Sequence, residues 1–284
     1  MKTIVSAAAT ATLAFAAPAL AQDARPVQPG PDGQANVPTS SAAVAPICTD
    51  RPTKSNFACT VPEGQFQIES DIGFHSIQTG GGARTDLTLF TNPTIKYGLT
   101  DSTDVEANIA PLVRVRSRVG DVVTTQESVG DLILRVKQRF TPTDQQVQFA
   151  AIPYVKVPTA ERGVGNREWE GGVIAPANIS LAGGYTLTLV PQLDFLLDGD
   201  GRGRHAQFQG VVNLGKQVAP DLTFYGELWT AQNFDPAGTV RQYSADTALA
   251  YLVTPTLQFD VGGNFGLNRN TPDVQLYVGV STRF

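Results

Sequence analysis

Apolar and polar residues alternate with a period of two along most of the chain, from about residue 63 to the last residue, Phe284. In the closing stretch "DVQLYVGVSTRF", even-numbered positions such as Val278 are mostly apolar, and odd-numbered positions such as Arg283 are mostly polar. Because successive side chains of a strand point to opposite faces, the pattern predicts strands with one apolar and one polar face. Twelve such strands are predicted, in the segments "GQFQIESDIGFH", "DLTLFTNPTIKYGL", "DVEANIAPLVRVRS", "VGDLILRVKQRF", "QQVQFAAIPYVKV", "REWEGGVIAPANI", "YTLTLVPQLDFLL", "HAQFQGVVNLGKQ", "DLTFYGELWTAQNF", "YSADTALAYLV", "TLQFDVGGNFGL" and "DVQLYVGVSTRF".

The connections between these strands alternate in length. Short turns such as "TDST" and "TPTD" alternate with longer loops such as "RVGDVVTTQE" and "PTAERGVGN", so the two ends of the sheet differ. Five prolines fall inside predicted strands, where each removes a donor from the hydrogen-bond ladder. These are Pro93, Pro111, Pro153, Pro176 and Pro191. We expect bulges near the long-loop rim to accommodate them.

The polar face decides between two folds that share this alternation. In a soluble β-sandwich it would meet water, whereas in an outer-membrane barrel it lines the interior and the apolar face meets lipid. The even strand number, the unequal rims and strands long enough to cross a bilayer favour the barrel. The sequence therefore predicts an all-β fold, a closed antiparallel up-and-down transmembrane β-barrel of about 12 strands. Its last strand, ending at Phe284, must pair with the first, because lipid offers an open edge no partner.

The N-terminus carries the marks of export. Lys2 precedes an apolar run from Ile4 to Ala17, and "ALA" ending at Ala21 is a small-residue cleavage site. Residues 1–21 are therefore predicted to be a signal peptide. Export and the predicted barrel together place the mature chain in the bacterial outer membrane. Residues 22–62 have no periodicity and are rich in Pro, Gly and Ser up to about residue 47, which predicts a flexible periplasmic leader before the barrel of residues 63–284.

Two cysteines, Cys48 and Cys59, lie in the second part of this leader. Export permits a disulfide that closes a small loop, and two unpaired thiols are the alternative. The histidines, His75 and His205, are distant in sequence, so nothing supports a metal site, and no cofactor is implied.

The formal charge of −5 becomes −6 once Lys2 is removed with the signal peptide, which argues against nucleic acid as a partner. The charges on the inward face suggest a function. Basic residues gather on the third to fifth predicted strands and acidic residues on the seventh to eleventh. The residues predicted to line the lumen are Arg114, Arg116, Arg135, Lys137, Arg139, Lys156, Asp194, Glu227, Asp246 and Asp260. Opposed walls could orient dipolar solutes and filter ions, or the groups could pair across the lumen and fill it.

Several segments resemble a known family. "TDRPTKSNFACTVPEGQFQIESD", "IPYVKVPTAERGVGN", "YGELWTAQNFDP" and "FGLNRNTPDVQLYVGVSTRF" are similar to the outer-membrane transporters grouped as the MetA-pathway of phenol degradation family, over about residues 49–284. The resemblance implies a barrel of about twelve strands that passes aromatic or other small compounds, and it assigns no functional residue. The C-terminal strand also resembles the signal by which the outer-membrane assembly machinery selects its clients.

We therefore predict a passive outer-membrane channel or transporter for small molecules, embedded in outer-membrane lipid, with the solute unidentified. An outer-membrane hydrolase is one alternative, for which His75 and His205 at the long-loop rim would be the available bases. A plugged structural or adhesive barrel is another. The stretch "DGDGRG" beside His205 lacks the downstream carboxylate of a full calcium loop and is interpreted as a surface turn.

Overall fold

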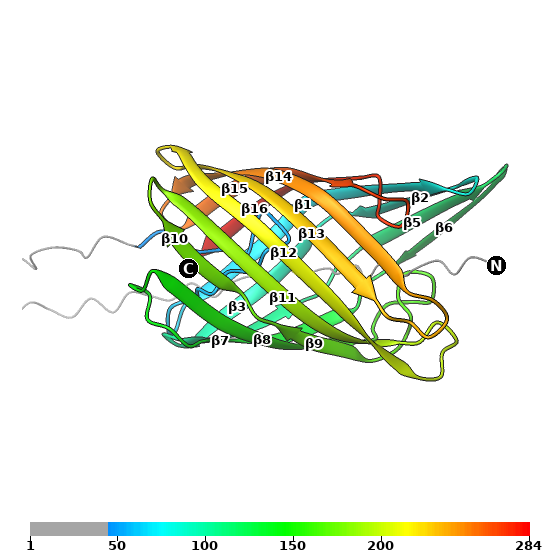
Figure 1. Ribbon diagram of the computed structural model, residues 1–284, viewed down its shortest axis with the longest axis horizontal. Coiled ribbons are helices and arrows are strands. Elements are labelled where there is room, and N and C mark those ends of the chain that lie inside the picture. The colour runs from blue at the N-terminus through cyan, green and yellow to red at the C-terminus, as the bar shows by residue number, and fades with distance from the viewer. Residues whose placement is uncertain (1–44) are drawn as a thin grey trace, which may run out of the picture.

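The chain folds into one closed antiparallel β-barrel (Figure 1), as a computed structural model describes it for residues 45–284. The predicted signal peptide and the first half of the leader lie outside the described residues. The described strands are β1 (Phe66–Gly80), β2 (Ala83–Leu89), β3 (Asn92–Thr100), β4 (Thr103–Asn108), β5 (Val113–Val119), β6 (Val122–Ser128), β7 (Leu132–Arg139), β8 (Val147–Val157), β9 (Glu170–Ile174), β10 (Ala177–Leu181), β11 (Tyr185–Leu197), β12 (Arg204–Ala219), β13 (Leu222–Asn233), β14 (Val240–Thr254), β15 (Leu257–Gly266) and β16 (Val274–Arg283).

These segments form the twelve barrel strands that the sequence predicts, because four barrel strands are each broken in two. β2 and β3 together pair with the two halves of β1, and β4 and β5 together pair with β3 and β2. β6 and β7 continue one another in the same way, as do β9 and β10, which both pair with β8 and β11. The predicted closed barrel of about 12 strands is confirmed.

Prolines mark three of the four breaks. Pro111 lies between β4 and β5, Pro176 lies between β9 and β10, and Pro93 is the second residue of β3. The third and sixth predicted strands are therefore interrupted at the residue that cannot donate to the ladder. Pro153 and Pro191 remain inside β8 and β11.

The stretch predicted as the loop "RVGDVVTTQE" is largely strand, which corrects the sequence analysis. β6 pairs with β5 over its whole length. Its side chains are exposed on both faces, so the stretch has no apolar alternation to reveal a strand.

The last strand closes the barrel, as predicted. β16 pairs with β15 on one side and with β1 on the other. Beyond its end, the backbone N–H of Phe284 donates to the carbonyl of Phe66 at 2.8 Å, and the N–H of Phe66 donates back at 3.3 Å. Because of this closure, the backbone N–H and C=O groups of β1 and β16 find partners in each other, which lipid could not provide.

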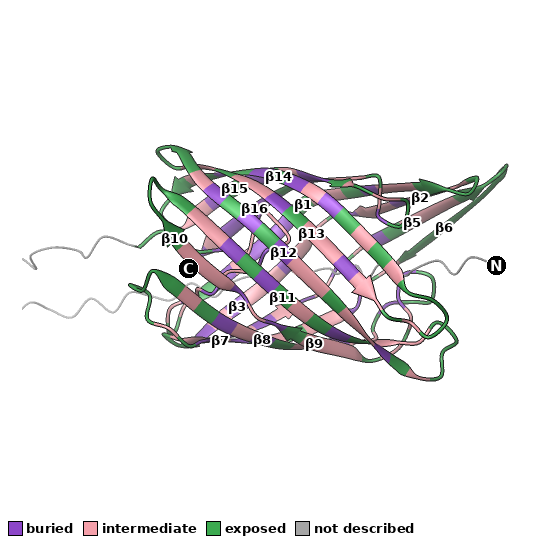
Figure 2. Cartoon of the chain, viewed as in Figure 1, coloured by how far each residue is buried: buried purple, intermediate pink, exposed green. Residues whose placement is uncertain are grey.

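The outward face of the barrel is apolar and the inward face is polar. Three neighbouring strands, β11, β12 and β13, illustrate this. Their outward residues Leu193, Val212 and Leu228 are 44%, 50% and 59% exposed, whereas the adjacent residues Asp194, Asn213 and Glu227 are buried. Figure 2 shows the resulting alternation of buried and exposed bands along β11 to β15. No helix within residues 45–284 is long and apolar enough to cross a membrane.

One bulge in β1 reverses this polarity on part of the wall. Asp71 pairs with Gly279 and Gly73 with Val278, so Ile72 is an extra residue, and the faces of β1 exchange beyond it. β2, β5 and β6, which we call the tongue, continue from this reversed half and extend beyond the barrel wall (Figure 1). The inward face of the tongue is apolar at its base, where Leu87, Leu89, Val113 and Val115 lie.

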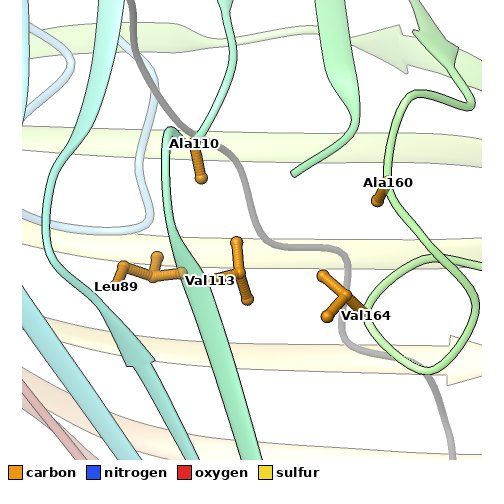
Figure 3. Close-up of a cluster of buried hydrophobic side chains, with 5 residues drawn as sticks. All are labelled: Leu89, Ala110, Val113, Ala160 and Val164. Carbon is orange, nitrogen blue, oxygen red and sulfur yellow. The ribbon is translucent and has the colours of Figure 1, made fainter. Parts of the chain in front are cut away.

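An apolar cluster covers this inward face. Leu89 and Val113 of the tongue are buried against Ala110 and against Ala160 and Val164, which the loop between β8 and β9 contributes (Figure 3). The loop is anchored by two backbone donors: Ala160 N–H to the Asp131 carboxylate and Glu161 N–H to the Ser128 hydroxyl, both 2.9 Å. The reversed wall thus keeps an apolar core on its lumen side.

The seam between β16 and β1 generates the first prediction. Replacing Val280 by proline should remove one ladder hydrogen bond within the membrane and leave a carbonyl without its donor, which costs several kcal/mol in lipid. The variant should lose the heat-resistant compact band on a denaturing gel, or unfold at lower urea concentration. Val280→Ala keeps the backbone donor and should fold like the parent; equal loss in both variants would contradict closure through this seam.

Candidate functional site: the lumen and its plug

The lumen is occupied by the segment that precedes β1. Residues 45–62, which we call the plug, bond with strands all round the barrel. Partners on widely separated strands are Ser281 of β16, Glu227 of β13, Asn178 of β10 and Asp104 of β4. A segment that contacts opposite sides of a closed barrel must lie inside it, where Figure 1 shows it in blue. This corrects the interpretation of residues 45–62 as part of a flexible leader.

Both legs of the plug lie at the rim that carries the short turns. Ile47 N–H donates to the carbonyl of Pro255 at 2.7 Å, and the Thr60 hydroxyl donates to the carbonyl of Asp101 at 2.8 Å. Both acceptors belong to the turns between neighbouring strands. A disulfide between Cys48 and Cys59 joins the two legs. The plug is therefore a covalently closed loop that enters from the short-turn side, with Arg51 to Lys54 deepest in the lumen.

A single carboxylate of the plug meets the basic side of the wall. Asp50 accepts hydrogen bonds from the ammonium groups of Lys96 in β3 and Lys137 in β7, at 2.5 and 2.7 Å. Burial by itself would raise the pKa of Asp50, but Lys137 and Lys96 hold it below its ordinary value. Asp50 therefore stays ionised, and it compensates part of the positive charge of Lys96 and Lys137.

Two cations of the plug meet the acidic side of the wall. The Arg51 guanidinium donates to Asp260 at 2.7 and 3.0 Å through two nitrogens and to Asp71 at 2.7 Å. Lys54 Nζ donates to Asp246 at 2.5 Å. The side chain of Asp260 is completely buried, so it depends on this partner for its charge to be compensated.

Aromatic rings of the wall also contact the plug. The Arg51 guanidinium lies 5.8 Å from the centre of the Tyr277 ring, and Lys54 Nζ lies 5.0 Å from the Trp229 ring. Phe57 meets Tyr225 edge-to-face with ring centres 6.4 Å apart. The plug thus covers ring surface that would otherwise line the lumen.

Eight of the ten residues predicted to line the lumen carry side chains in the barrel interior, and four of them contact the plug. These four are Lys137, Glu227, Asp246 and Asp260. Arg135 pairs with Glu106 at 3.5 Å, and Lys156 pairs with Asp131 and Glu170. Asp194 accepts from the Tyr154 hydroxyl, and Arg139 donates to the carbonyls of Thr141 and Asp101. Half of these residues are therefore compensated by the plug, and the others interact with groups of the barrel itself.

Arg114 and Arg116 are placed on the other face, which corrects the sequence analysis. Arg114 pairs with Thr88, Thr88 with His75, and His75 with Leu276, whose side chain is 54% exposed on the outside of the barrel. Directly paired residues share a face, so both arginines point outward. The error arises within the predicted strand: Glu106 of β4 points inward, but the interruption at residues 109–112 changes the face, so that Val113 of β5 is inward and Arg114 outward. The bulge at Ile72 makes the matching change in β1.

Three charged residues of the plug are absent from the predicted set, namely Asp50, Arg51 and Lys54. They lie in the stretch "TDRPTKS", immediately after Cys48, in a segment without periodicity. Lys96 was missed as well. The useful signal was a run of charges enclosed by two cysteines just before the first strand of a barrel whose walls are themselves charged.

The two histidines lie apart from the plug. His75 is on the outer face of β1, with Nδ1 2.9 Å from the Thr88 hydroxyl. His205 is buried near the long-loop rim, with Nδ1 2.9 Å from Asp198 and 3.8 Å from Asp235. Within residues 45–284, no serine or cysteine side chain is hydrogen-bonded to either imidazole. The geometry therefore does not assemble the nucleophile and base that a serine hydrolase needs.

The pairing of Arg51 with buried carboxylates gives the second prediction. Arg51→Gln leaves Asp260 and Asp71 without their cation, which costs about 3 kcal/mol and favours release of the plug into water. Amide hydrogen exchange of residues 45–62 should then accelerate by roughly 100-fold. Arg202→Gln on an exposed loop serves as the control. Unchanged exchange in Arg51→Gln would mean that this ion pair does not hold the plug.

Solved structures of other proteins share the fold of this barrel. A crystal structure of an outer membrane channel from Pseudomonas putida F1 superposes with a TM-score of 0.66 at 15% identity, over 80% of this chain and 98% of that one. The NanC porin superposes with a TM-score of 0.50 at 10% identity, over 76% of this chain and 98% of that one. These likenesses establish the outer-membrane barrel fold that the sequence predicts.

No curated protein matches the chain. A family model does match, over residues 49–284, and its description is "Putative MetA-pathway of phenol degradation". The match begins within the plug and runs to the last strand. The chain therefore belongs to this family.

Proposed function

We propose that this protein is a passive channel for small molecules across the outer membrane, with the plug as its closed state. The observation that carries the proposal is the character of the contact between plug and wall. Residues 45–62 are held mainly by ion pairs and hydrogen bonds, and few apolar residues of the plug are buried in it. Water can replace such contacts far more readily than it can replace an apolar core.

The wall behind the plug has the features of a permeation path. Its buried acidic side chains outnumber its buried basic ones, so an opened lumen would carry a net negative charge. Tyr225, Trp229 and Tyr277 would lose their plug contacts and offer ring faces to a passing solute. These rings fit small aromatic solutes, which is also the class that the description of the family names.

A structural barrel with a permanent plug is the competing function. It predicts that the lumen conducts in no state, because residues 45–62 would be part of the folded core. The disulfide between Cys48 and Cys59 is compatible with both functions, since it closes the plug loop on itself and does not tie it to the wall.

Removal of the plug gives the third prediction. The chain lacking residues 45–60 should show stable single-channel currents in planar bilayers, whereas the parent should be mostly closed. The double variant Arg51→Gln with Lys54→Gln should lie between them, with openings more frequent than in the parent. Arg202→Gln with Arg241→Gln removes two exposed cations elsewhere and should behave like the parent. A deletion variant that folds but never conducts would leave the structural barrel as the better account.

The charges of the wall give the fourth prediction. In the chain without its plug, reversal potentials in a salt gradient should show cation preference. Asp246→Asn should reduce this preference, and Arg135→Gln should increase it, because the two residues carry opposite charges on the lumen side. If both variants keep the selectivity of their parent, the lumen charges do not govern ion passage.

A further inference from the structure

The outer face of the tongue is unlike the rest of the barrel exterior, because it is charged. Four arginines point outward from β2 and β5, together with two carboxylates, which leaves an excess of positive charge. They are Arg84, Arg114, Arg116 and Arg118, with Asp86 and Glu127. Neither the plug nor the lumen uses these side chains.

The carboxylates do not satisfy all four guanidinium groups. Asp86 accepts from Arg84 at 2.6 Å and lies 3.8 Å from Arg116, while Glu127 accepts from Arg114 at 2.5 Å. Arg118 has no charged partner within residues 45–284 and is exposed. It lies directly opposite Arg84 in the β2–β5 ladder, an arrangement of like charges that is unfavourable unless an anion lies between them.

The position of the face along the barrel indicates where that anion would come from. Phe90 follows β2, is 43% exposed, and packs under Arg114, whose guanidinium lies 5.4 Å from the ring centre. Exposed aromatic rings concentrate where the hydrocarbon of a bilayer meets its headgroups. Arg116 and Arg118 continue along β5 away from this ring, toward the β5–β6 turn. They therefore lie at headgroup level or above it, since arginine is costly in hydrocarbon.

We infer that the outer face of the tongue binds the phosphate groups of an anionic lipid headgroup in the outer leaflet. Arginine presents a planar fork that matches phosphate oxygens, and charge-assisted bonds of this kind are among the stronger ones. Arg84, Arg116 and Arg118 supply the donors, and the phosphate supplies the negative charge that the pair of opposed arginines lacks. The neighbouring apolar wall, with Leu276 and Val278 exposed, faces the acyl chains of the same lipid.

Lipid binding would also stabilise an otherwise weak part of the sheet. β6 pairs with β5 alone, and its side chains are exposed on both faces. A strand with one free edge at the end of a projecting hairpin has few contacts to order it. Phosphate bound to the adjacent β5 would fix the tongue against the membrane surface.

The fifth prediction tests this inference by native mass spectrometry of the purified mature protein in detergent. The probe is bis-phosphorylated lipid A, with phosphatidylcholine as the zwitterionic comparison and inorganic phosphate as competitor. The parent should bind lipid A in preference to phosphatidylcholine. Arg84→Gln with Arg116→Gln and Arg118→Gln should weaken lipid A binding by about five-fold per arginine, or roughly 100-fold together.

A matched control replaces three exposed arginines elsewhere at the long-loop rim, Arg202, Arg241 and Arg269, by glutamine and should bind like the parent. Asp86→Asn removes the carboxylate that competes for Arg84 and Arg116, and it should tighten binding. Gel mobility before and after heating shows that each variant is folded. Equal binding by parent and tongue variant, equal loss in the control, or full displacement by millimolar inorganic phosphate would overturn the inference.

Discussion

A polypeptide surrounded by lipid has to provide a partner for each of its own backbone N–H and C=O groups, and the rest of this structure follows from that constraint. The ladder from β1 round to β16 meets this requirement only because the last strand returns to the first. Closure in turn encloses a space. The alternation that sends leucines and valines toward lipid sends aspartates, glutamates and lysines into that space, where their charges must be compensated or hydrated.

The plug supplies part of this compensation, beside the wall's own ion pairs such as Lys96 with Glu69. Asp50 faces Lys96 and Lys137, while Arg51 and Lys54 face Asp71, Asp260 and Asp246 across the lumen. A buried ion pair contributes little net stability, because both partners lose their hydration, but removal of one partner is costly. Such contacts specify where a segment docks without holding it as firmly as an apolar core. An arrangement of this kind suits a segment that has to leave and return.

The same physics decides which parts of the structure can be predicted from the sequence. The lipid-facing strands could be predicted because lipid requires a strictly apolar outer face. The alternation of the sequence therefore predicts the twelve strands and their closure. The plug could not, because its contacts are polar, irregular and made to residues more than 200 positions away, such as Ser281 and Asp260. β6 escaped detection for a related reason: it meets no lipid, and its sequence is therefore free of the alternation. Pro111 and Pro176 can be recognised in the sequence as residues that cannot donate to the ladder, but the sequence does not show that a strand ends at each of them.

The misplacement of Arg114 and Arg116 shows how much one residue can decide in such a fold. Alternation assigns a face only while the register is unbroken. The extra residue at Ile72 exchanges the faces of β1 beyond it, and β2 and β5 follow through their pairing, whereas β16 keeps its own alternation. Within the hydrocarbon this exchange would put arginines into lipid. It is tolerated here because the bulge lies before the point at which the tongue leaves the barrel wall, so the charged face emerges among headgroups, while Leu89 and Val113 gain an apolar core under the loop that carries Ala160. The bulge thus separates two parts of this wall: below it the polar face encloses the plug, and above it the polar face of the tongue is turned outward.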